Sequence, residues 1–190
     1  MATALHEIRF HGRGGQGSVS AAALLSVAAF LDGYEAQAFP RFGSERRGAP
    51  VEAYVRISRE PIRRHNQIYE PDAVVIQDPT LLRSENVTAG LRDGGFVILN
   101  GEPPATATSS SAAVWLGIPA SRIGRACLGR PLPNTALLGA LAAVTEWVSM
   151  DALEEAVTNH LAHKGEEVVL GNIQALHQGR EAAVHPGPPA

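Results

Sequence analysis

The residues most suited to chemistry in this 190-residue chain form a glycine-dense turn near its amino end. Gly12, Gly14 and Gly17 fit the pattern G-x-G-x-x-G, between an apolar stretch and an Ala-rich stretch that begins near Ser18. Glycine accepts positive φ and lets a backbone approach a ligand closely, and the free N–H groups at a helix start attract anions. The predicted phosphate site comprises Gly12, Arg13, Gly14, Gly15, Gln16 and Gly17. The alternative is a tight turn that only packs a helix onto its strand, because this pattern alone is weakly specific.

A second concentration of chemistry is the arginine-rich segment between two prolines, Pro40 and Pro50. Arg41, Arg46 and Arg47 fall within seven residues of one another. Guanidinium forks suit phosphate and carboxylate groups. Loops that follow the first and second strands of a doubly wound sheet open at the same carboxyl edge, so we expect this loop to face the glycine turn. A solvated basic loop and a contact with acids of a neighbouring subunit are the alternatives.

The glycine turn also raises the possibility of dinucleotide binding. That function needs an acidic residue at the end of the second strand, about 20 residues on, to hold a ribose. Glu35 lies instead at the start of that strand, and Arg41 follows its end. Because Arg41 could meet a 2′-phosphate, a stand-alone NADP-binding protein remains an alternative.

Cysteine and histidine usage argues against redox or metal chemistry in this chain. Cys127 is the only cysteine, so the chain cannot supply the thiolates of an iron–sulfur cluster, and its apolar neighbours favour a buried thiol. His160 and His163 share a helical face and His177 follows, but a zinc site needs further ligands at suitable spacing. We predict no metal site and no catalytic residue.

Alternating strand and helix patterns predict the fold. We expect strands at residues 5–11, 34–39, 51–57, 73–76, 95–99 and 114–117. Helices are expected at 18–31, 134–148, 150–163 and 166–178, with a short helix through 82–83. Serine at 18 or 20 and Asn134 or Thr135 are the expected caps. This order predicts an α/β fold, a three-layer α/β/α arrangement with a mixed, mostly parallel sheet, in one domain over 1–180 with a Pro-rich tail at 181–190.

The composition fits a folded chain without a nucleic-acid or membrane partner. Hydrophobic residues make up 45% and charged residues 18%, and the net charge is −3, which gives no general attraction to polyanions. No apolar run approaches the roughly 20 residues of a membrane span. We therefore expect a cytoplasmic protein.

Several motifs together resemble one protein family over nearly the whole chain. They are residues 9–17, 36–40, 42–51, 61–63, 67–72, 77–81, 133–140 and 171–173. In this combination the chain resembles the gamma subunit of the 2-oxoacid:ferredoxin oxidoreductases, with the pyruvate and 2-ketoisovalerate members most similar. The resemblance implies the fold of domain III of pyruvate:ferredoxin oxidoreductase.

The resemblance implies a division of labour among alpha, beta, gamma and delta subunits. Such complexes oxidise a 2-oxoacid with coenzyme A (CoA) to an acyl-CoA and CO₂, and pass electrons to ferredoxin or a similar acceptor. Thiamine diphosphate with Mg²⁺ and [4Fe–4S] clusters lie mainly on the other subunits, and this chain has neither a G-D-G diphosphate motif nor cluster cysteines. We expect it to be inactive alone.

Coenzyme A is the ligand that the resemblance suggests for this chain. The turn Gly12–Gly17 would hold a CoA phosphate with backbone N–H groups, Arg46 and Arg47 would add charge-assisted bonds with Arg41 and Arg13, and Asn134 at a helix start is a further candidate. The alternative is a purely structural scaffold subunit. The sequence leaves open whether the 2-oxoacid is pyruvate, a branched-chain or an aromatic one.

Overall fold

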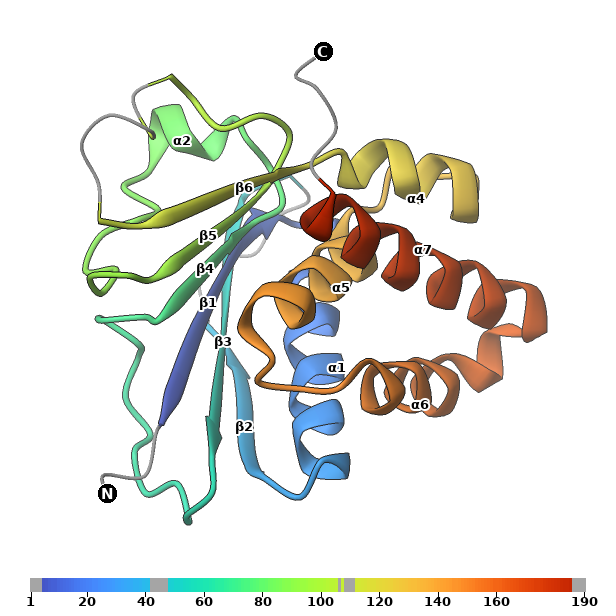
Figure 1. Cartoon of the computed structure of the whole chain (residues 1–190), viewed down its shortest axis with the longest axis horizontal. Helices are drawn as coiled ribbons and strands as arrows, with labels where there is room; N and C mark the ends of the chain where they lie inside the picture. The colour runs from blue at the N-terminus through green and yellow to red at the C-terminus, as the bar shows by residue number, and fades with distance from the viewer. Residues whose placement is uncertain (1–4, 42–47, 106, 108–111, 186–190) are drawn as a thin grey trace.

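The computed structural model describes residues 5–41, 48–105, 107 and 112–185. A six-stranded sheet in the order β2-β3-β1-β4-β5-β6 forms its centre (Figure 1). The strands are β1 (His6–Arg13), β2 (Glu35–Pro40), β3 (Pro50–Ser58), β4 (Ala73–Ile76), β5 (Phe96–Asn100) and β6 (Val114–Ile118). β3 is antiparallel to both of its neighbours, and the other pairs are parallel. The predicted mixed, mostly parallel sheet is confirmed.

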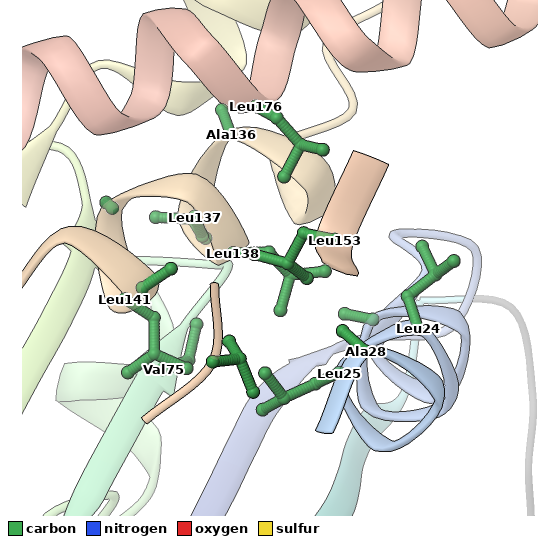
Figure 2. Packing of buried hydrophobic residues seen from close by; sticks show 14 of the residues in the cluster. Leu24, Leu25, Ala28, Val75, Ala136, Leu137, Leu138, Leu141, Leu153 and Leu176 are labelled. Atoms are coloured by element: carbon green, nitrogen blue, oxygen red, sulfur yellow. The ribbon is translucent and has the colours of Figure 1, made fainter. Parts of the chain in front are cut away.

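One face of the sheet carries nearly all of the helices. They are α1 (Ser18–Leu31), α4 (Ala120–Leu128), α5 (Asn134–Thr145), α6 (Met150–Leu161) and α7 (Glu166–Val184), with a 3₁₀ turn at Ala162–Lys164. α1 and α5 lie against the strands, while α6 packs on α1 and α7 packs along α5 (Figure 1). Buried leucines such as Leu25, Leu138 and Leu153 fill the space between these layers (Figure 2). The main core therefore lies on this face.

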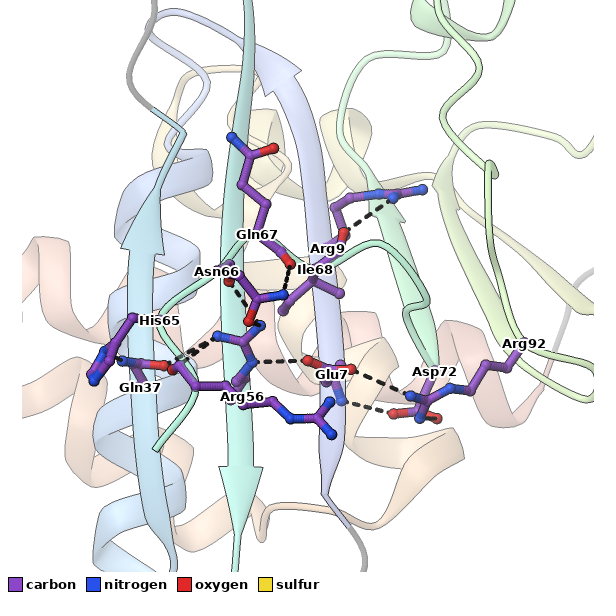
Figure 3. Close-up of polar contacts among 11 residues, drawn as sticks. Glu7, Arg9, Gln37, Arg56, His65, Asn66, Gln67, Ile68, Asp72 and Arg92 are labelled. Carbon is purple, nitrogen blue, oxygen red and sulfur yellow. Dashed lines mark hydrogen bonds and ion pairs between the residues drawn. The ribbon is translucent and has the colours of Figure 1, made fainter. Parts of the chain in front are cut away.

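The opposite face has a thinner outer layer, formed by the short α2 (Leu81–Ser84) and by loops (Figure 1). Under α2, apolar side chains of β4 and β5 form a second small core with Val87. Over β1 and β3 the same face carries buried charged side chains such as Glu7, Arg9 and Arg56, and the 59–72 segment crosses it (Figure 3). The expected α/β three-layer arrangement is thus present, with one layer much slighter than the other.

Buried charges hold the 59–72 segment onto the sheet. Arg56 of β3 is fully buried, and its Nε donates to Glu7 Oε1 over 2.8 Å. Its other nitrogens donate to Gln37 and to the backbone carbonyls of Arg64 and Asn66 (Figure 3). A buried guanidinium needs such partners for its N–H groups, so this set of bonds fixes the segment that crosses the face.

Some element boundaries differ from the predictions. α4 is absent from the predictions, although Ala120, Ile123 and Cys127 recur at the spacing of one helix face. α5 ends at Thr145 rather than at residue 148, because Glu146 takes the left-handed conformation with φ 54°. α7 continues to Val184, beyond residue 178, so part of 181–190 is helical, whereas 186–190 lies outside the described residues.

Candidate functional site

The glycine turn and the end of the arginine-rich loop at residues 48–50 meet at the carboxyl edge of the sheet. β1 and β2 both run antiparallel to β3, so both end at this edge. The Gly14 N–H donates to the Ala49 carbonyl over 3.0 Å, and the Gly48 N–H donates to the Gly14 carbonyl over 3.3 Å. The described ends of the arginine-rich loop therefore lie at the same edge as the glycine turn, whereas Arg46 and Arg47 lie outside the described residues.

The glycine turn leads into α1 without a side-chain cap. Gly17 is the N-cap residue and has φ 81°, a conformation that L side chains rarely adopt. The prediction that Ser18 or Ser20 caps the helix is wrong, because Ser18 Oγ instead donates to Gln77 Oε1 over 2.9 Å. The first N–H groups of α1 have no acceptor within the helix, so they are available to an anion.

A second helix begins beside the first. Asn134, the first residue of α5, lies against the glycine turn, and a Cβ atom built on Gly17 would be 2.8 Å from Asn134 Nδ2. Pro133 is the N-cap of α5 and provides no side-chain cap. Asn134 Oδ1 is buried and has no hydrogen-bond partner within the described residues. Two uncapped helix starts thus converge, which concentrates positive backbone potential.

The side chains of Arg13 and Gln16 bond within the edge itself. Arg13 Nε lies 3.2 Å from Asp78 Oδ2, Nη2 donates to Thr80 Oγ1 over 2.8 Å, and Nη1 donates to the Gly48 carbonyl over 3.1 Å. Gln16 Oε1 accepts from the Arg13 N–H, and its Nε2 donates to Asp78. These two candidate residues therefore shape the turn through their side chains.

Sequence reasoning missed the residues that follow β4. Gln77 is fully buried beneath the turn, and a Cβ atom on Gly12 would lie 2.9 Å from its Oε1. Its Nε2 has no partner within the described residues. The Asp-Pro-Thr order after Gln77 is a turn signal, because an Asp side chain often bonds the backbone two residues on. Asp78 does so, since its Oδ1 accepts from the Thr80 N–H.

Arg41 directly follows β2 and lies next to a cluster of titratable groups. Its exposed guanidinium lies 3.2 Å from Glu52 Oε1, which raises the pKa of Arg41. Burial alone would raise the pKa of Glu52, but a hydrogen bond from Tyr54 and the neighbouring positive groups lower it on balance. Burial beside Arg9 lowers the pKa of His11 to about 4. Glu52 thus stays ionised and holds Arg41 at the rim of the edge.

The remaining sequence candidates lie away from this edge. Cys127 is half-buried rather than fully buried, and desolvation raises its pKa. His160 and His163 are exposed, and His177 Nε2 lies 2.8 Å from Glu154. Within the described parts of the chain, no three His, Cys, Asp or Glu side chains gather as metal ligands would.

The strand order does not favour the dinucleotide alternative. In dinucleotide-binding folds the second strand lies beside the first, so that a residue at its end reaches the ribose. Here β3 separates β2 from β1, and Glu35 lies at the amino end of β2, away from the glycine turn. No acidic residue from β2 is therefore placed to hold a ribose near Gly12–Gly17.

The fold is that of an α/β chain in which two helices without side-chain caps begin at the carboxyl edge of the sheet. The sequence profile of the family "Pyruvate ferredoxin/flavodoxin oxidoreductase" matches residues 7–182. The chain belongs to this family. The resemblance noted from its motifs is thereby confirmed.

Named relatives are subunits of 2-oxoacid oxidoreductases. The chain is 47% identical over 154 residues to pyruvate synthase subunit PorC of Methanosarcina barkeri, covering 80% of this chain and 85% of that one. It is 51% identical over 155 residues to the common subunit gamma of the pyruvate/ketoisovalerate oxidoreductases of Thermococcus litoralis, covering 80% and 84%. The crystal structure of pyruvate oxidoreductase subunit PORC from Thermotoga maritima superposes with a TM-score of 0.81 at 34% identity, covering 93% and 96%. The chain is therefore of the gamma-subunit type, a part of a multi-subunit oxidoreductase.

None of its described helices is long and apolar enough to cross a membrane.

Proposed function

We propose that this chain binds the nucleotide end of coenzyme A within a 2-oxoacid oxidoreductase complex. The observation that carries the proposal is the convergence of two uncapped helix starts, α1 after Gly17 and α5 at Asn134. Coenzyme A carries a diphosphate and a 3′-phosphate, and helix starts suit such groups. Arg46 and Arg47 belong to the loop whose end is bonded to the glycine turn, so they add charge-assisted bonds.

The other steps belong to the partner subunits in this proposal. Thiamine diphosphate with Mg²⁺ on a beta-type subunit carries out the decarboxylation, and [4Fe–4S] clusters on other chains, including a ferredoxin-like delta type, carry the electrons. This chain, with an alpha-type partner, completes the CoA site and is inactive alone. The complex works in the cytoplasm, where reducing conditions keep a lone thiol such as Cys127 reduced.

Kinetics of the assembled complex test the CoA role. Replacing both Arg46 and Arg47 by Ala should raise the KM for CoA about tenfold or more, because two charged hydrogen-bond donors are lost. The KM for the 2-oxoacid should stay within about twofold, since the thiamine site is on another subunit. Steady-state rates with an artificial acceptor, at varied CoA and at varied oxoacid, provide the measurement.

A matched control is the exposed pair Arg63 and Arg64 in the 59–72 segment. The same double change there removes equal charge, but over the thin face of the sheet and away from its carboxyl edge, and should leave the KM for CoA unaltered. An unchanged KM for CoA in the Arg46/Arg47 variant would refute the CoA role. If that variant instead failed to assemble, the chain would be a scaffold subunit.

A further inference from the structure

Asp78 receives four polar contacts at the end of β4. Its Oδ1 accepts from the Thr80 N–H over 2.9 Å and from Thr80 Oγ1 over 2.6 Å. Its Oδ2 accepts from Gln16 Nε2 over 2.9 Å and lies 3.2 Å from Arg13 Nε. Both carboxylate oxygens are thus used within the fold, as the burial of a charged group requires.

These contacts join three segments that are far apart in the sequence. Gln16 and Arg13 both belong to the glycine turn, and Arg13 is also the last residue of β1. Arg13 also reaches the Gly48 carbonyl, at the end of the arginine-rich loop. Thr80 Oγ1 lies between Asp78 and Arg13, because it donates to the first and accepts from the second. Asp78, together with Arg13, therefore connects the glycine turn and the turn after β4 to Gly48 at the end of the arginine-rich loop.

Asp78 is ionised, which allows its carboxylate to accept all of these contacts. Its side chain is only 14% exposed. Burial alone would raise its pKa, but hydrogen bonds from Thr80 and Gln16 and the charge of Arg13 lower the pKa below its ordinary value. The carboxylate is therefore ionised at neutral pH. It neutralises Arg13, so Arg13 contributes geometry to the edge more than net positive charge.

We infer that Asp78 is a positioning residue that holds the glycine turn and the end of the arginine-rich loop in the arrangement that receives an anion. This inference rests on the proposed CoA role. Asp78 does not touch the anion, because a carboxylate would repel a phosphate. It acts through Gln16 and Arg13, which set the path of the backbone whose N–H groups form the site.

The test compares Asp78→Asn with the unsubstituted protein in the assembled complex. Asparagine keeps the shape but sets an NH₂ group against the N–H donors of Gln16 or Arg13. Amide hydrogen exchange should become faster in peptides that contain Gly14, Gln16 and Gly48. The KM for CoA should rise about fivefold to tenfold, while kcat at saturating CoA and the KM for the oxoacid stay within about twofold.

Two further variants keep the test sharp. Asp72→Asn is the matched control, because Asp72 also accepts from an arginine, Arg92, and from a backbone N–H, that of Glu7, but at the other edge of the sheet. It should leave the KM for CoA unaltered. Thr80→Val removes the hydroxyl between Asp78 and Arg13 without changing a charge. It should speed amide exchange at the glycine turn and raise the KM for CoA, each by less than Asp78→Asn does.

Each outcome bears on the inference in a defined way. Unchanged exchange at the glycine turn in Asp78→Asn would overturn it. The inference would also be overturned if Asp78→Asn exchanged faster but left the KM for CoA unaltered, while the Arg46/Arg47 variant raised that KM. If neither variant raised the KM for CoA, the proposed function would fail and this inference with it. Exchange at the turn would then show separately whether Asp78 holds the loops.

Discussion

Two charged residues buried against the thin face of the sheet, Glu7 and Arg56, have a structural role. Their ion pair spans 2.8 Å and is closed to water. Such a pair gives little net stability by itself, but removing one partner leaves a buried charge unmatched. Its observable effect here is to fix the 59–72 segment, since Arg56 also bonds two backbone carbonyls there (Figure 3).

The titration of His11 affects the stability of the folded chain. It is buried next to Gly12, and its Nε2 accepts a hydrogen bond from Arg9 over 2.9 Å. Burial and the charge of Arg9 lower its pKa from 6.5 to about 4 in the folded chain. The unfolded chain therefore binds more protons between pH 6.5 and pH 4, and the free energy of unfolding falls as the pH falls through that window.

We predict that His11→Gln abolishes this part of the pH dependence. The unsubstituted chain should lose about 3 kcal/mol of stability between pH 6.5 and pH 4 because of His11, a loss that a glutamine cannot show. Urea unfolding at several pH values measures it. His163→Gln, at an exposed position, is the control. Its free energy of unfolding should depend on pH as that of the unsubstituted chain does. An identical slope in His11→Gln would contradict the prediction.

At the scale of elements, close packing of α7 on α5 determines where the candidate site can form. A Cβ atom on Gly179 would collide with the Ala136 carbonyl oxygen, and one on Gly139 would collide with the Leu176 carbonyl oxygen. The two helix backbones therefore touch. Because Asn134 begins α5, this contact helps to set the distance between the start of α5 and the glycine turn.

We predict that Gly179→Ala destabilises the chain by about 1–3 kcal/mol, because it overpacks a tight contact. Helix propensity alone predicts the opposite sign, since Ala is favoured over Gly in a helix by about 1 kcal/mol. Urea midpoints measure the change. Gln178→Ala, on the exposed side of the same turn, should stay within about 0.5 kcal/mol. A gain of stability in Gly179→Ala would show that the helices can separate at little cost.

At the scale of the whole molecule, the chain presents apolar surface to its surroundings. α1 has no charged residue over its 14 positions, and its outer face exposes Val19, Val27, Phe30 and Leu31, with Phe30 71% exposed. Exposed apolar patches of this kind are typical of chains that act in assemblies. This agrees with relatives that are subunits of oxidoreductases.

We predict that the lone chain has no oxoacid-dependent activity. Purified alone with thiamine diphosphate, Mg²⁺, CoA and a 2-oxoacid, it should not reduce an artificial acceptor. Purified anaerobically from its own cells by a C-terminal tag, it should bring down a brown complex that does, and a panel of oxoacids would identify the substrate. Turnover by the lone chain would contradict the assignment of the chemistry to partner subunits.

Much of this architecture could be predicted from local patterns. Runs such as Ala73–Ile76 are apolar and β-branched, which is typical of a buried parallel strand. The alternation of apolar and polar residues in 51–57 predicts a strand with one face toward water. The glycine turn between a strand and a helix was equally clear. The combined motifs also identified the family, because they extend over nearly the whole chain.

Only the tertiary structure determines which partners each side chain contacts. Arg13 was a phosphate candidate by type and place, yet its guanidinium is bonded to Asp78, Thr80 and Gly48. Asn134 lies beside Gly17 because α5 packs on the sheet next to α1. Local patterns determine which segments become strands and helices, because each pattern depends on neighbours along the chain. They cannot determine which distant residues meet, because that depends on the strand order, including the insertion of β3 between β1 and β2, and on how the helices pack together.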